Sequence, residues 1–303
     1  MFESIESYLA ALKSALKDAD PALVQDALWD AEAHLNSGLA AQREQHPEVP
    51  EAEALAGLQA TFGTPEEVAE AYLEREAVVA QALHPKGTST ATESEAPLAP
   101  WPGFFEVMKT PKAYTSLLYL VMSLATGIFF FTWAVTGLSL SLGLFVLIIG
   151  IPFAIAFLGS VRMLALVEGR LVEALLDVRM PRRPSLLPEG KGWMERLKNL
   201  LTDGHTWTSL AYLVLHLPLG VLFFTLMITG LSLALGLIAV PIISIFVGLP
   251  SVVLWNGLEA QHPVLQVILA AIVGSLLLIG TLHLALALGR LQGFLAKHML
   301  VRK

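Results

Sequence analysis

The first 84 residues carry apolar positions at helical spacing, in short runs separated by polar breaks. One run begins near Ile5, and a second follows the start signal Asp20-Pro21. Gly63 closes a third run, and Thr64-Pro65-Glu66-Glu67 has the form of a capping box with proline at the first helical position. The pattern predicts a small domain, residues 1–84, of four short helices that each turn one face inward.

Long apolar segments follow a polar stretch. Residues 85–112 open with PKGTSTATESEAPLAPWPG, whose proline, serine, threonine and glycine content predicts a flexible linker. We expect Thr136–Ser141 to turn between the first two crossings, and the charged stretch after Leu164 to lie as an amphipathic helix on the cytoplasmic surface. The segments long enough to cross the hydrocarbon as helices are Tyr114–Val135, Leu142–Leu164, Trp207–Thr229 and Val264–Leu288.

The membrane part is built from a repeat. Residues 115–144 and 208–237 align without a gap at an offset of 93, and 19 of 30 positions are identical. A second match, ALVEGRL from Ala165 against ALALGRL from Ala285, has an offset of 120, so the second copy holds roughly 27 extra residues. This predicts a duplicated membrane unit, with one repeat in residues 113–200 and the other in 201–303.

The extra residues of the second copy fall near 238–264. Leu231–Trp255 is apolar enough to span but is interrupted by Pro241, Gly248 and Pro250. If this segment spans the membrane, the chain crosses five times. If it is re-entrant, the chain crosses four times and the basic tail beginning at Arg290 lies inside. The positive-inside rule favours four crossings. The broken insertion is our candidate ligand or sensing surface, marked by Pro241, Pro250 and Trp255.

Composition agrees with an integral membrane protein, since 55% of the residues are hydrophobic, 15% are charged, and the mean hydropathy is +0.64. Charge is divided unevenly: the first 84 residues hold 16 Asp and Glu against four Lys and Arg. The amphipathic N-terminus is not a signal peptide, so we expect the acidic head to be cytoplasmic.

Cysteine is absent, which excludes disulfides and thiolate metal sites. The fold class predicted is all-α.

Two stretches carry a family resemblance. The head, with YLAALKSALKDADPALVQDALWDAEAHL and FGTPEEVAEAYLE, resembles the HAAS signalling domain. The duplicated part, with LPLGVLFFT, a GLSLGL-type turn and ALVEGRLVEALLDV, resembles the Putative sensor family of multi-pass membrane proteins, often found in front of histidine kinases. The resemblance implies a signalling role whose output passes through a partner, for which a PadR-type transcription regulator is one expectation.

No constellation in the chain requires an enzyme or a cofactor. His34 is expected to pack rather than to bind a ligand, and His216 with His283 could ligate haem, although hydrogen bonding between helices is the simpler interpretation. We expect no Asp or Glu inside the crossings, which weakens a proton-coupled or cation transporter. Matching places in the two copies make Arg170 and Arg290 candidates for signal coupling.

The basic segment between the repeats is expected to bind anionic lipid headgroups through Arg179, Arg182 and Arg183, and no direct contact with nucleic acid is expected. The hypothesis is a non-enzymatic sensor or signalling adaptor of the bacterial inner membrane, compatible with a homo-oligomer, with both termini cytoplasmic. In it the membrane module senses envelope state, lipid or an apolar ligand, and the head recruits a regulator. The alternative is a small transporter or channel with a path between the repeats.

Overall fold

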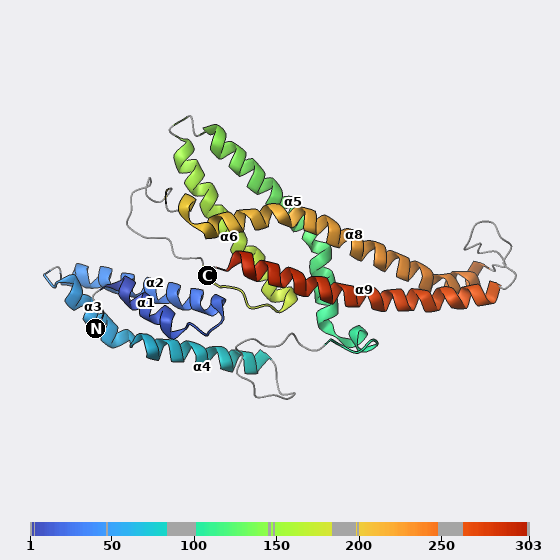
Figure 1. Ribbon diagram of the computed structural model, residues 1–303, viewed down its shortest axis with the longest axis horizontal. Helices are drawn as coiled ribbons and strands as arrows, with labels where there is room; N and C mark the ends of the chain where they lie inside the picture. Colours follow the sequence, from blue (N-terminus) through green and yellow to red (C-terminus); the bar gives the residue numbers. More distant parts are fainter. Residues whose placement is uncertain are drawn as a thin grey trace. The chain divides into compact units, whose positions relative to one another are not determined.

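A computed structural model describes residues 2, 4–46, 48–83, 101–144, 147, 149–183, 198, 200–247 and 263–301. Every regular element in these ranges is a helix, which confirms the all-α prediction. The chain divides into two compact units (Figure 1). One comprises Met1–Ala99, Arg179–Arg196 and Val301–Lys303, and the other comprises Pro100–Val178 and Leu197–Leu300.

The N-terminal unit contains the four predicted helices, two of which are longer than expected, at 25 and 19 residues. The predicted start of the second helix at Asp20 is confirmed, since the Asp20 carboxylate accepts a hydrogen bond from the backbone N–H of Ala22 and caps the helix. Glu67 and Thr64 complete the predicted capping box through bonds of 2.8 and 3.3 Å. Gly63 ends the third helix at a φ of 103°, which favours glycine. The helices are α1 (Ile5–Ala15), α2 (Pro21–Gln45), α3 (Glu51–Phe62) and α4 (Pro65–Leu83).

The core of this unit forms where the inward faces of the helices meet. Tyr8 is fully buried and its hydroxyl donates to the carbonyl of Gly63 at 2.9 Å. His34 is exposed at the edge of this core and stacks on Phe62 with ring centroids 4.6 Å apart. The buried apolar residues are Tyr8, Leu12, Leu16, Leu23, Ala27, Ala31, Leu35, Leu39, Ala54, Leu55, Val68 and Ala69.

The second unit holds the long helices. Among the described residues, four helices are long and apolar enough to cross a membrane, in agreement with about four crossings. A short 3-10 helix, η1 (Glu106–Lys109), precedes the first of them. The four are α5 (Pro111–Leu144), α6 (Gly150–Leu176), α8 (Gly204–Val247) and α9 (Pro263–Leu300).

Two sequence-based boundaries in the first repeat are wrong. Thr136–Ser141 does not turn but continues α5 to Leu144, and the returning helix α6 begins at Gly150 rather than at Leu142. The physical reason is that Thr136–Ser141 holds one glycine and no proline, which weakens a helix but does not oblige it to end. Helix α6 runs on past Leu164 to Leu176, as predicted, and the location of its charged stretch at the cytoplasmic surface remains a prediction.

The second repeat also differs from expectation. Helix α8 passes through both Pro218 and Pro241 without ending, so the predicted break at Pro241 is wrong. Prolines are tolerated in apolar helices of this kind because neighbouring groups satisfy the freed carbonyls. Gly248, Pro250 and Trp255 lie outside the described residues. The second hairpin is longer than the first, with 44 and 38 residues in α8 and α9 against 34 and 27 in α5 and α6, and its two helices lie side by side (Figure 1).

Helices α5 and α8 cross at a pair of equivalent glycines. A Cβ atom on Gly127 would lie 2.9 Å from the carbonyl oxygen of His216, and one on Gly220 would lie 2.4 Å from the carbonyl oxygen of Ser123. Because residues 123 and 216, like 127 and 220, are 93 positions apart, the two contacts are reciprocal. The repeats are thus related at this crossing by an approximate two-fold axis.

Candidate functional site

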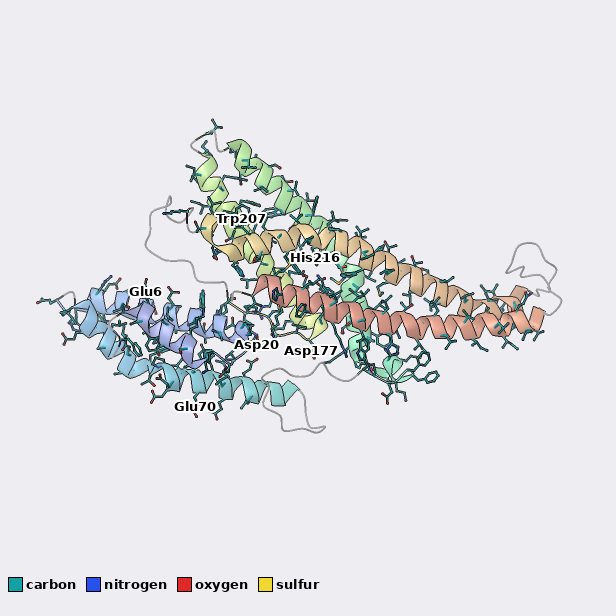
Figure 2. The ribbon with its side chains drawn as sticks, viewed as in Figure 1. Glu6, Asp20, Glu70, Asp177, Trp207 and His216 are labelled. Carbon is teal, nitrogen blue, oxygen red and sulfur yellow. The ribbon has the colours of Figure 1, made fainter. Side chains whose placement is uncertain are left out.

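A cluster of buried polar side chains lies where the four long helices meet. Its members come from every one of these helices, and each is at most 3% exposed. His216, labelled in Figure 2, marks its place on α8 beside the crossing with α5. We call this group the buried polar cluster; it comprises Tyr119 of α5, Glu168 of α6, Tyr212 and His216 of α8, and Gln292 of α9.

One carboxylate oxygen joins the two repeats. The hydroxyl of Tyr119 donates to Oε1 of Glu168 at 2.5 Å, and the hydroxyl of Tyr212 donates to the same oxygen at 3.2 Å. The two tyrosines are repeat counterparts, 93 positions apart. At the second offset, of 120, the counterpart of Glu168 is Leu288, so two equivalent donors converge on a single acceptor that only the first repeat supplies.

Gln292 closes the cluster from α9. Its side-chain Nε2 donates to the hydroxyl of Tyr212 at 2.9 Å and lies 3.4 Å from that of Tyr119 and 3.5 Å from Nδ1 of His216. The other ring nitrogen, Nε2 of His216, lies 3.0 Å from Oγ1 of Thr126, and which nitrogen of the ring donates depends on its tautomer. The imidazole thus connects Gln292 of α9 to Thr126 of α5.

Two oxygens of the cluster can still accept hydrogen bonds. Among the described residues, neither Oε2 of Glu168 nor Oε1 of Gln292 has a hydrogen-bond partner. A carboxyl group buried among apolar helices is expensive unless a proton, a bound cation or hydrogen bonds compensate it. Chemically, the cluster can hold a proton or bind a small polar or cationic group, and it can tie helix positions to one hydrogen-bond pattern.

A second polar contact joins the repeats near the start of α8. Arg162, on α6 and 5% exposed, pairs with Asp203 at 2.7 Å and donates to Thr206 at 2.8 Å. The other carboxylate oxygen of Asp203 accepts from the backbone N–H of His205 at 3.2 Å. Asp203 therefore both caps the start of α8 and anchors it to α6.

The residues predicted from sequence fall in different places. His216 belongs to the buried polar cluster, whereas His283 lies beside Trp101 and Phe104, with ring centroids 6.4 and 6.2 Å apart, so the two histidines have different neighbours. Arg170 pairs with Glu173 on the same helix at 3.3 Å. The guanidinium of Arg290 lies 4.4 Å from the centre of the Trp101 ring. The proposed coupling role of Arg170 and Arg290 remains a prediction.

The other candidates are not members of the buried polar cluster. Arg179, Arg182 and Arg183 belong to the N-terminal unit, where acids of α2 contact them, and lipid binding by these arginines remains a prediction. Pro241 lies within α8.

Sequence reasoning missed the central residue. We predicted no Asp or Glu inside the crossings, with the second crossing ending at Leu164. Glu168 lies just beyond that limit, fully buried in a helix whose whole length is a candidate span. The identity of Tyr119 and Tyr212 was a usable signal, since a polar residue repeated within apolar copies marks a position with a polar partner.

Comparison with known families matches this architecture. Residues 119–300 match the model of the family described as Putative sensor, a range that includes all members of the buried polar cluster. The chain belongs to the Putative sensor family. This Putative sensor carries a HAAS domain in front, matched over residues 7–71, so both predicted resemblances are confirmed in their order. No curated protein and no solved structure matches the chain. The two families and the apolar helices identify a membrane protein of the sensor and signalling type, and neither family is enzymatic.

Proposed function

We propose that this protein is a non-enzymatic sensor and adaptor of the bacterial inner membrane. In this proposal the membrane unit responds to envelope state, lipid or an apolar ligand, and the HAAS head recruits a cytoplasmic regulator. The observation that carries it is the sharing of one Glu168 oxygen by Tyr119 and Tyr212. Two repeats held at one acceptor form a natural point at which a change in helix positions becomes a change in bonding.

The coupling follows from the directionality of hydrogen bonds. A shift of α5 against α8 would lengthen one of the two bonds to Glu168, and the small separation at Gly127 and Gly220 leaves little room for gradual sliding. Packed helices of this kind tend to move between discrete arrangements. Helix α6, which carries Glu168, continues along the chain into Arg179–Arg183 of the N-terminal unit. This continuity gives the membrane unit a covalent route to the head.

Topology and partner complete the proposal. Basic residues between the repeats and in the tail support a cytoplasmic location for both termini by the positive-inside rule. A reporter fused at Lys303 tests this, and periplasmic activity would overturn it. The family resemblance makes a PadR-type regulator our proposed partner, and binding of a purified regulator of that class to the full chain in nanodiscs tests it.

The sensing role is tested with the full chain in nanodiscs of two acyl-chain lengths. Hydrogen exchange of α6 and α8 is measured in each bilayer for the wild type, for the double variant Tyr119→Phe and Tyr212→Phe, and for the control Tyr114→Phe. Tyr114 is exposed and donates to the carbonyl of Met108, outside the cluster. We expect the bilayer-dependent difference in exchange to persist in the control and to disappear in the double variant. An equal response in all three proteins would refute the cluster as the coupling point.

A transporter or channel is the second candidate, and Glu168 is the observation that favours it. Buried acids in membrane helices often mark proton or ion pathways. Proteoliposomes loaded with a pH-sensitive dye and challenged with proton or sodium gradients separate the two functions. If the wild type carries flux and Glu168→Gln abolishes it, the transporter function replaces the adaptor proposal. If the wild type gives no flux above empty liposomes, the result supports the adaptor proposal.

A further inference from the structure

The head holds a short basic segment of the same chain. Arg179–Arg183, which follows α6, belongs to the N-terminal unit. Oδ1 of Asp26 on α2 accepts from the backbone N–H groups of Arg182 and Arg183 at 2.6 and 2.8 Å. Gln25, beside it, donates from Nε2 to the carbonyl of Arg183 at 3.0 Å. Two adjacent side chains of α2 therefore hydrogen-bond three backbone groups of the segment.

Arginine side chains extend the same contact. Arg179 reaches Asp26 at 3.2 Å and Glu76 of α4 at 2.9 Å. Arg183 pairs with Asp30 at 3.1 Å, and its guanidinium lies 4.7 Å from the centre of the Trp29 ring, within range of a cation–π interaction. The two arginines are four residues apart, and Met180 next to the first is fully buried. The segment therefore presents two charges, one apolar side chain and a pair of N–H groups.

The receiving surface has the properties of a binding site. Gln25 and Asp26 are only 8% and 7% exposed, and buried polar groups require partners. Burial raises the pKa of Asp26, and the N–H groups of Arg182 and Arg183 oppose that rise. The segment thus supplies hydrogen bonds to a carboxylate whose burial is unfavourable. An acidic head also attracts a basic segment at long range.

We propose that the surface formed by Gln25, Asp26, Trp29, Asp30 and Glu76 is a docking site for an arginine-containing peptide segment, which Arg179–Arg183 of the same chain occupies at rest. A regulator with a segment of the same chemistry binds there once the resident segment leaves. The proposal rests on the recruiting role of the head and names its surface. Since the resident segment continues from α6, movement of the membrane unit controls whether the site is open.

Occupancy at rest is tested by crosslinking in the full chain, which contains no cysteine. The variant Asp30→Cys with Arg183→Cys is treated with a short thiol crosslinker and digested for mass spectrometry. The control pairs Arg183→Cys with Glu70→Cys, an exposed acid on α4, labelled in Figure 2. We expect the crosslinked peptide in the first variant and far less in the control. Equal or absent crosslinking in both overturns the resident contact.

Docking is tested with a labelled peptide of residues 178–184, VRMPRRP, and the full chain in nanodiscs of neutral lipid. The variant Arg179→Ala with Arg183→Ala is expected to bind the peptide about tenfold more tightly than the wild type, because its own segment no longer competes. Adding Asp26→Ala to that variant should remove the gain, because the acceptor for both backbone N–H groups is then lost, whereas adding Glu70→Ala should not. Equal peptide affinity in all four proteins overturns docking. Loss of docking with an intact bilayer response of the cluster would leave the sensing role standing.

Discussion

Tyr119 and Tyr212 occupy the same position in the two repeats, and their hydroxyls donate to the same oxygen of Glu168, at 2.5 and 3.2 Å. Duplication usually yields two copies of a contact, but here it yields two donors and one acceptor. The second repeat has Leu288 where the first has Glu168, and it contributes Gln292 where the first has Val172. The asymmetry converts a two-fold arrangement into a single polar cluster.

Removing these hydroxyls should weaken the membrane unit in a coupled way. Tyr119→Phe is expected to reduce the free energy of unfolding by about 1–2 kcal/mol, and Tyr212→Phe by less because its bond is longer. The double variant should lose more than the sum, since it leaves Oε1 of Glu168 without either tyrosine donor. Unfolding in mixed micelles, followed by tryptophan fluorescence, measures all three. Strictly additive losses would show that the two tyrosines act independently.

The crossing of α5 and α8 should be intolerant of a methyl group. A Cβ at residue 220 would lie 2.4 Å from a backbone oxygen, which cannot move as a side chain can. Gly220→Ala is therefore expected to destabilise by about 1–3 kcal/mol, with Gly127→Ala in the same direction. Gly143→Ala is the matched control, because nothing lies within 4 Å of its added Cβ. Its thermal stability should be unchanged or higher, since alanine favours a helix. Equal effects at 220 and 143 would contradict the close crossing.

Local signals predicted the head well. The capping box at Thr64 and Glu67, the glycine stop at Gly63 and the start at Asp20 each depend on neighbouring residues only, so the sequence contains the whole cause. The long helices were also predictable from apolar length. Their ends were not, because Pro241 would end a helix in water and Gly137 would weaken one, whereas both are tolerated within an apolar helix.

The buried polar cluster depends on contacts between distant residues. Tyr119 and Glu168 are 49 positions apart, and Gln292 and Tyr212 are 80 apart. Periodicity places each residue on a helix face but does not say which faces meet. Glu168 also sits among Arg170 and Glu173, a setting typical of an exposed helix, so its local sequence argued against its burial.

Tyr8 of the head should ionise at a higher pH than a solvent-exposed tyrosine. Burial, with Glu66 and Glu67 nearby, raises the pKa of Tyr8 from 10.0 to about 12. The folded head therefore keeps a proton that the unfolded chain loses above pH 10, so this stabilisation is complete below pH 10 and is lost as the pH rises towards 12. The absorbance of tyrosinate in the full chain, minus that of Tyr8→Phe, should rise near pH 12. A rise near pH 10 would show that Tyr8 is not buried.

The pair of Arg162 and Asp203 should behave as a buried ion pair that fixes the start of α8. Arg162→Leu, which introduces the residue type found at its counterpart Leu282, leaves the Asp203 carboxylate without its partner and is expected to destabilise by about 3 kcal/mol. Combined with Asp203→Asn, the loss should fall below the sum of the single losses, because no unpaired charge remains and the amide oxygen can still accept from His205. Arg170→Leu is the control. Its pair with Glu173 is exposed, so its effect should stay within about 1 kcal/mol. The cycle is measured as denaturation midpoints of the wild type, Arg162→Leu, Asp203→Asn, the double variant and Arg170→Leu. Equal losses for Arg162→Leu and Arg170→Leu would refute the anchoring of α8 to α6.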